Sequence, residues 1–215
     1  MTSDANPPRG RRSLDTDRLT AFSDGVFSIA ATLLVLDLAV HPPGTPLEQV
    51  LHAWPGYLAY VVSFLTIGGA WLAHTAMTDR LTRSDLNFLR LNLLVLLVVA
   101  FLPFPTSLVT DALRTGEGRN VAVTIYGMTL LAIHVLGSAL SAYARHAHLY
   151  APPGEDQEAK GTHRRLLPVV IGYVIAILVG LVVPVAAVAV YFGLAVYLIV
   201  PLHQIARVVF RRSSG

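Results

Sequence analysis

The chain has 215 residues, of which 54% are hydrophobic and 13% are charged. Soluble domains carry about 25% charged residues, so this composition excludes an ordinary soluble protein and indicates an integral membrane protein. The sequence contains no cysteine, which excludes disulfides and thiolate metal sites. The net charge of +3 comes from arginines in short loops between apolar runs, where membrane orientation is the commoner cause, and we expect no nucleic-acid partner.

The N-terminal segment, residues 1–17, is polar and lacks the apolar run of a signal peptide, so we expect it to be cytoplasmic and the first apolar helix to be retained. Apolar runs of about 20 residues predict transmembrane spans. They lie near residues 18–40, 54–77, 87–110, 120–144, 164–182 and 185–206. The sequence therefore predicts an all-α domain of six transmembrane helices over residues 18–206, followed by a cytoplasmic tail over residues 207–215.

The first span carries a carboxyl group, Asp24, among apolar residues. A carboxyl group in hydrocarbon is costly, so such a residue normally faces a partner helix or a watery path. Thr20, Asp24, Ser28 and Thr32 are spaced four apart and share one helical stripe. Such a stripe either lines water or bonds neighbouring helices, and the residues alone leave both possibilities open.

Candidate partners for Asp24 lie in the next two spans. Trp71 and His74 are spaced to share one helix face in the second span, and Asn92 lies in the third. An interhelical hydrogen bond is the commoner role for such residues, and a proton relay is the rarer one.

Prolines predict two interruptions. Pro103 and Pro105 near the outer end of the third span predict a bend, with nearby hydroxyl groups bonding the freed carbonyls. The stretch 166–206 contains no Asp, Glu, Lys or Arg and is about twice as long as one crossing requires. It must turn back, and the segment 180–184, which ends in Pro184, is the predicted turn.

Basic residues gather on one side of these spans. With the N-terminus inside, only Arg114 and Arg119 of the 16 basic residues face the outer side, which leaves 14 on the inner side. This bias predicts a multi-pass protein of a bacterial inner membrane with both termini cytoplasmic. Asp37 and Glu48 flank the first outer loop, so we expect this mouth to be mildly acidic.

Catalytic motifs are missing from the sequence. There is no His-Glu-x-x-His, no Gly-x-Ser-x-Gly and no phosphate-binding loop, so we expect neither an enzyme nor a bound cofactor or metal. The Thr-Val-Gly-Tyr-Gly potassium filter is missing too. From spacing alone, the chain is a polytopic membrane protein with a candidate ion pathway at its first helix.

Three motifs follow one another along the first half of the chain. They are Arg18-x-x-x-Phe22-Ser23-Asp24, then Trp71-x-x-His74, then Leu91-Asn92-Leu-Leu followed by Phe101-Leu-Pro-Phe104-x-Thr106. With them the sequence resembles the transmembrane protein 175 family of potassium channels in its short bacterial form. The resemblance is closest over residues 18–110.

This resemblance implies a homotetramer in the lipid bilayer, with a central pore lined by the first helix and permeable to potassium and other monovalent cations. Ile29 occupies the position of the family's apolar constriction. Thr32 matches a hydroxyl layer implicated in selectivity, and Leu33 and Leu36 match further apolar rings. Asp37 and Glu48 then concentrate cations at the outer mouth.

The resemblance also implies an interhelical network that holds the pore helix in place. Its members are Arg18, Phe22, Ser23, Asp24, Trp71, His74 and Asn92. Two other functions stay open at this point. One is a proton channel or proton-coupled transporter that uses Asp24 and His74, with His134 as a further candidate. The other is a structural or sensor protein that conducts nothing.

Overall fold

The computed structural model describes residues 11–38, 45–150 and 159–199. Regular structure in these ranges is helical, which confirms the all-α prediction. The elements are α1 (Arg11–Leu33), η1 (Leu34–Leu38), α2 (Pro46–His52), α3 (Trp54–Thr78), α4 (Leu86–Phe101), α5 (Pro103–Thr115), α6 (Arg119–His146), α7 (Ala159–Gly180) and α8 (Pro184–Ile199).

Four helical stretches among the described residues are long and apolar enough to cross a membrane. They are Thr16–Leu36, Trp54–Thr78, Leu86–Thr115 and Arg119–His146. Two shorter apolar helices, Pro168–Gly180 and Pro184–Ile199, occupy the region of the fifth and sixth predicted spans. The end of the sixth predicted span, residues 200–206, lies outside the described residues, so a total of six crossings stays a prediction.

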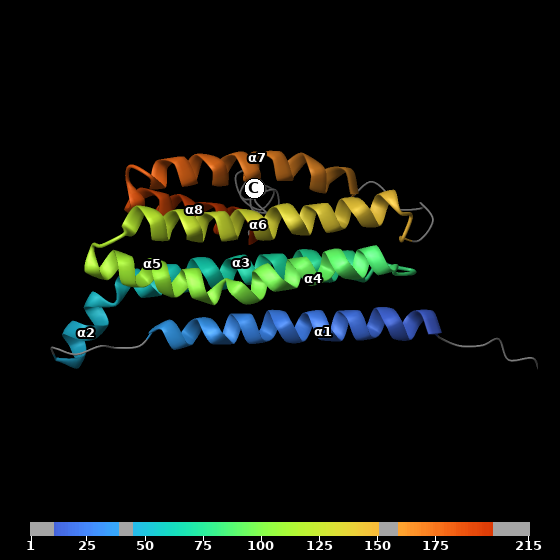
Figure 1. The fold of residues 1–215 in the computed structure, drawn as a ribbon, viewed down its shortest axis with the longest axis horizontal. Coiled ribbons are helices and arrows are strands. Elements are labelled where there is room, and N and C mark those ends of the chain that lie inside the picture. Colours follow the sequence, from blue (N-terminus) through green and yellow to red (C-terminus); the bar gives the residue numbers. More distant parts are fainter. Residues whose placement is uncertain (1–10, 39–44, 151–158, 200–215) are drawn as a thin grey trace, which may run out of the picture.

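The long helices run side by side in a layered bundle (Figure 1). Helix α1 lies at one edge and packs on α3 and α4, while η1 continues onto α3 and α5. Helix α6 is central to the other half, where it contacts α4, α5 and α7, and α8 closes the bundle against α7 and α3. The arrangement covers α1 on one side only.

The third predicted span is broken where the prolines stand. Helix α4 ends at Phe101 and α5 begins at Pro103, because proline has no N–H to continue the hydrogen-bond ladder. Leu102 keeps right-handed helical backbone angles, with φ −56° and ψ −35°, so the chain continues in one general direction. The N–H and the hydroxyl of Thr106 both donate to the Leu102 carbonyl, at 3.2 and 2.8 Å, so this hydroxyl bonds a carbonyl that the prolines do not free. The predicted bonding of the freed carbonyls by hydroxyl groups stays a prediction.

The last two helices meet at the predicted turn. Helix α7 ends at Gly180 and α8 begins at Pro184. The N–H groups of Val182 and Val183 both donate to the carbonyl of Val179, at 3.0 and 2.7 Å, and so close the turn.

A cluster of buried tyrosines fills the second half of the bundle. The ring of Tyr191 contacts those of Tyr126 and Tyr173, with centroids 5.8 and 6.0 Å apart. Tyr126 and the Ser63 hydroxyl share a hydrogen bond of 2.8 Å, which joins α6 to α3. Gly127 makes room for this cluster, because a Cβ there would overlap the Tyr191 hydroxyl.

Candidate functional site

Helix α1 has two different faces. One face is buried against α3 and α4 and consists of Leu19, Ser23, Phe27, Ala30 and, in η1, Leu34. These residues are spaced three or four apart, as the buried side of a helix requires.

Away from this buried face, α1 and η1 expose several large apolar side chains. Ile29 is 60% exposed, Leu33 is 42% exposed and Leu36 is 69% exposed. Thr32 lies on the same exposed side, and its hydroxyl donates to the carbonyl of Ile29 at 2.9 Å. The four residues assigned to the pore by resemblance thus point away from the other helices of their own subunit.

A chain of hydrogen bonds joins α3, α4 and α1 beneath this uncovered face. The His74 imidazole Nε2 lies 2.8 Å from the Asn92 side-chain oxygen, and the Asn92 amide donates to the Ser23 hydroxyl at 3.1 Å. The Ser23 hydroxyl in turn donates to the Leu19 carbonyl at 2.8 Å. His74, Asn92 and Ser23 are all buried.

The direction of this chain follows from its last bond. A carbonyl only accepts, so the single Ser23 proton points at Leu19, and the Ser23 oxygen must accept from the Asn92 amide. The Asn92 oxygen then faces His74 and can only accept, which makes the His74 Nε2 a donor. The Nδ1 of His74 has no hydrogen-bond partner among the described residues.

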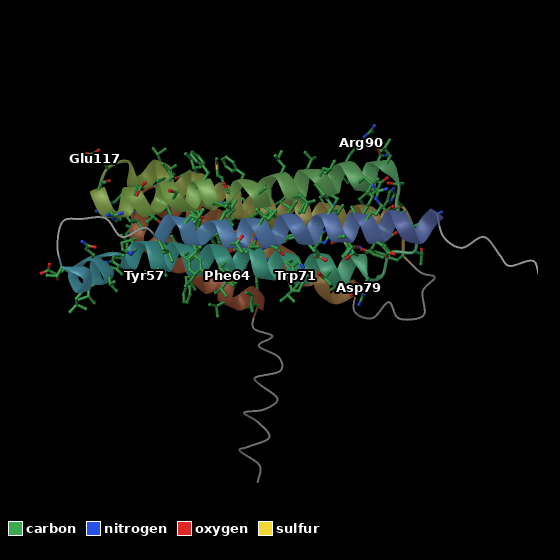
Figure 2. All side chains as sticks on the ribbon, turned by 90° about the horizontal axis from the view of Figure 1, so that it is seen from below. Tyr57, Phe64, Trp71, Asp79, Arg90 and Glu117 are labelled. Atoms are coloured by element: carbon green, nitrogen blue, oxygen red, sulfur yellow. The ribbon has the colours of Figure 1, made fainter. Side chains whose placement is uncertain are left out.

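Asp24 belongs to a separate contact between the same helices. The Trp71 indole N–H donates to its Oδ1 at 2.8 Å, from α3 to α1. Figure 2 shows Trp71 on α3, in line with Phe64 and Tyr57. Of the three candidate partners for Asp24, the structure gives it Trp71, whereas Asn92 bonds Ser23 and His74 bonds Asn92.

The predicted polar stripe of α1 is divided among different contacts. The Thr20 hydroxyl donates to the Thr16 carbonyl at 3.0 Å, and the Thr32 hydroxyl bonds its own helix as described above. Ser28 is exposed. Among the four residues of the stripe, Asp24 is the one whose side chain bonds another helix within the described part of the chain.

Two predicted members of the interhelical network make none of the hydrogen bonds described above. Arg18 and Phe22 are exposed on α1, and within the described ranges neither takes part in the bonds that link Ser23, Asp24, Trp71, His74 and Asn92. Phe22 shares the uncovered side with Ile29.

The predicted outer mouth is partly described. The Glu48 carboxylate accepts from the Thr45 N–H at 2.9 Å, and the Thr45 hydroxyl accepts from the Glu48 N–H at 3.4 Å, which is a capping box at the start of α2. Glu48 is exposed. The side chain of Asp37 lies outside the described residues.

Sequence reasoning missed a contact at the opposite end of the bundle. The Asp85 carboxylate accepts from the Phe88 N–H at 2.7 Å and from the Tyr143 hydroxyl at 2.8 Å. An Asp just before an apolar run is a sequence signal for a helix N-cap, so the bond to the Phe88 N–H could have been predicted from the sequence. The second joins residues 58 positions apart and carries no local signal.

Metal-binding side chains do not gather in the described part of the chain. No group of three or more His, Cys, Asp or Glu side chains there could hold a metal ion. The arrangement that remains is an uncovered apolar helix face backed by a hydrogen-bonded support.

Comparisons with known proteins agree with this arrangement. The family model for the endosomal/lysosomal potassium channel TMEM175 matches residues 18–103. A potassium channel of Streptomyces collinus is 40% identical over 163 residues, which span 74% of this chain and 79% of that protein. A potassium channel of Chamaesiphon minutus is 40% identical over 139 residues, which span 62% of this chain and 68% of that protein.

The chain is also similar to a larger human protein and to a solved structure. The human endosomal/lysosomal proton channel TMEM175 is 28% identical over 171 residues, and the match spans 33% of that protein. The crystal structure of a lysosomal potassium-selective channel TMEM175 homolog from Chamaesiphon minutus superposes with a TM-score of 0.74 at 32% identity. That match covers 86% of this chain and 97% of the other.

Proposed function

The chain belongs to the TMEM175 family of ion channels, and on this premise we propose that it forms a potassium-permeable cation channel whose central pore is lined by α1 from four copies. The proposal places residues 18–206 in the membrane as one six-helix channel domain, with residues 1–17 and 207–215 cytoplasmic. In this proposal the channel uses no cofactor, and potassium is the permeant ion. The membrane is the inner membrane of a bacterium.

One observation carries this proposal. Ile29 and Leu33 of α1 and Leu36 of η1 are exposed on a side that the subunit's own described helices leave uncovered, whereas Ser23 of α1 is buried. Lipid alone could cover an apolar face, and in this proposal the same face of three further copies covers it instead. Four such faces around an axis form rings of aliphatic side chains.

The ring of Ile29 side chains is the proposed constriction. A narrow hydrophobic neck excludes water and therefore ions, and a small widening admits a partly hydrated cation. Such a neck discriminates between potassium and sodium less sharply than a cage of carbonyl oxygens, because it replaces less of the ion's hydration shell.

Thr32 is suited to face a cation next to this constriction. Its hydroxyl proton is used on the Ile29 carbonyl, so the lone pairs that remain on the oxygen can only accept. An oxygen held in this way replaces part of the lost water. Leu33 and Leu36 continue the apolar lining.

The hydrogen-bonded residues beneath α1 support the pore and do not contact the permeant ion in this proposal. The Ser23–Asn92–His74 chain and the Asp24–Trp71 bond fix α1 against α4 and α3. Arg18 and Phe22 complete the family's motif at the start of the helix. Asp37 and Glu48 attract cations to the outer mouth, an effect that weakens as salt screens the charges.

The test of the proposal is potassium flux through the purified protein in liposomes, measured beside the mass of the oligomer. We expect potassium permeation and a mass of four chains, with a modest preference for potassium over sodium in bi-ionic recordings. Absence of cation flux from a correctly assembled oligomer contradicts the proposal, and strong potassium selectivity contradicts the hydrophobic neck as its filter.

A second candidate function is a proton channel or proton-coupled transporter. The human relative is named a proton channel. The Nδ1 of His74, which has no hydrogen-bond partner among the described residues, carries a lone pair that can accept a proton. A proton route would use this atom together with Asp24. His134 offers only its Nε2, because its Nδ1 donates to the Leu130 carbonyl at 2.8 Å.

Proton flux into the same liposomes separates the two functions. Flux of protons without potassium, abolished by Asp24→Asn, favours the proton route. Potassium flux that survives this substitution favours the supporting role of Asp24.

A further inference from the structure

At the end of the bundle where α1 begins, two chain segments far apart in sequence are fastened together. The N–H and the hydroxyl of Thr82, in the α3–α4 connection, both donate to the carbonyl of Leu149, at 2.9 and 3.0 Å. The Arg83 guanidinium donates to the carbonyl of Ala147 at 3.3 Å. We call residues 81–85 together with residues 143–150 the latch.

The chain after α6 adopts a specific conformation to make these bonds. His148 has a φ of +51°, in the left-handed region that residues with a side chain seldom adopt. The next side chain, Leu149, is buried, and its N–H donates to the Ala144 carbonyl at 2.9 Å. An uncommon backbone angle persists only where surrounding contacts hold it. The contacts after α6 therefore fix this part of the chain in its conformation.

Asp85 is the point at which the latch reaches a helix. One carboxylate oxygen accepts from the Phe88 N–H and caps α4, while the other accepts from the Tyr143 hydroxyl of α6. The Phe88 N–H, and after it the Tyr143 hydroxyl, hold the pKa of the Asp85 carboxyl below its ordinary value. The carboxylate is therefore charged at neutral pH and keeps both oxygens available as acceptors.

The latch and the pore support lie on the same side of α4. Asn92 follows Asp85 by seven residues, which is about two helical turns, so both residues share one face. Phe88 lies between them and is fully buried, as is Asn92. Helix α4 therefore meets the end of α6 at Asp85 and meets Ser23 of α1 two turns later.

We propose that Asp85 and Tyr143 are positioning residues for the pore helix, because they hold α4 in register against α6 and so keep Asn92 against Ser23. Neither residue touches the permeant ion. The proposal rests on the proposed function in taking α1 as the pore helix. The hydrogen bonds described here for the latch join the α3–α4 connection, the start of α4 and the end of α6, so the proposed effect on α1 passes through α4.

Two small substitutions act on the Asp85–Tyr143 bond, one from either side. Tyr143→Phe removes the bond with its hydroxyl. Asp85→Asn keeps one oxygen as the cap of α4 and replaces the charged acceptor with a neutral amide, which cannot accept from Tyr143 and offers its hydroxyl only a weaker bond of reversed direction. Tyr57→Phe is the matched control, because it also removes one hydroxyl, at the end of α3 opposite Asp79 (Figure 2).

The first readout is the unitary conductance of single channels in bilayers. A substitution that only reduces folding lowers the number of channels and leaves each one unchanged. We expect Tyr143→Phe and Asp85→Asn each to change unitary conductance in the same direction, because α1 lines the proposed pore and its displacement alters the width of the neck. The double variant should change it no further, and Tyr57→Phe should leave it unchanged.

The second readout is hydrogen exchange of the purified oligomer, which needs no current. We expect faster exchange over residues 19–27 of α1 in both variants, although neither altered side chain contacts that segment. Faster exchange confined to residues 80–88 and 140–150, with unchanged unitary conductance, overturns the proposal. If the unsubstituted protein carries no potassium current, the proposed function fails, and the exchange comparison still decides whether the latch acts on α1.

Discussion

The indole N–H of Trp71 donates to the carboxylate of Asp24 at 2.8 Å, and this bond joins α3 to α1 at the surface of the single chain. Trp71 is 40% exposed and Asp24 is half-buried, so the pair borders the uncovered face of α1. The carboxyl group that marks the first span as unusual thus has a defined neighbour. This pair and the buried Ser23–Asn92 bond are separate supports of one helix.

Widening the proposed constriction should increase conduction. Ile29→Asn replaces an aliphatic side chain with a polar one, so the neck wets more readily. We expect conductance to rise and potassium selectivity to fall, measured by bi-ionic recordings in planar bilayers. The control is Ile175→Asn, the same change at an exposed isoleucine of α7. Unchanged conductance and selectivity in Ile29→Asn contradict the pore assignment.

Removing the Asp24 carboxylate should impair folding or assembly more than permeation. Asp24→Ala leaves the Trp71 N–H without its acceptor, whereas Asp24→Asn keeps an oxygen in place. We expect size-exclusion chromatography to show less oligomer for Asp24→Ala and near-normal amounts for Asp24→Asn. Trp71→Phe should lose no further oligomer when combined with Asp24→Ala. Additive losses argue that the two residues act separately.

Asn92 should be the most sensitive member of the buried chain. Asn92→Ala leaves the buried His74 N–H without an acceptor and removes the donor to Ser23, at a cost of about 1–3 kcal/mol for each unsatisfied group. Thermal unfolding in detergent checks this. Asn87→Ala is the control on the same helix, because Asn87 is exposed and bonds Arg90 at 3.4 Å. Equal shifts in Tm for the two variants count against a buried network.

Gly127 should tolerate no side chain. A Cβ there overlaps the Tyr191 hydroxyl and lies 2.8 Å from a side-chain carbon of Ile177, so Gly127→Ala should destabilise the protein by about 1–3 kcal/mol. Gly137→Ala, on the same helix, meets nothing within 4 Å and should be neutral or slightly stabilising. Tyr191→Phe removes the nearest obstructing atom and should partly restore the Tm of Gly127→Ala.

The Asp85 cap predicts an acid dependence of stability. Because hydrogen bonds lower the pKa of Asp85 in the folded protein, unfolding is accompanied by proton uptake at acid pH. The stabilisation is complete above the unfolded pKa and is lost as pH falls through the lower, folded pKa. Between about pH 5 and pH 3, Tm should therefore fall more in the unsubstituted protein than in Asp85→Asn. If Tm falls equally in the two proteins, the acid sensitivity belongs to other carboxyl groups.

Features that depend on short stretches of chain could be predicted from the sequence. The break at Pro103 follows from the missing N–H of proline. The turn before Pro184 follows because the apolar stretch around it is longer than one membrane crossing requires. The position of Asp24 within an apolar helix likewise needs only local reading. The sequence offers three candidate partners for Asp24, and the choice among them depends on how the helices pack.

The amino-acid sequence by itself determined an all-helical membrane protein and the place of Asp24 in its first helix, because hydrocarbon transfer and backbone bonding act within one segment. Only the tertiary structure decided that Asn92 bonds Ser23, that Tyr143 bonds Asp85 and that Ile29 lies on an uncovered face. Those outcomes depend on how whole helices pack and rotate against one another. Packing is settled by side-chain shapes far apart in the chain, which no local pattern encodes.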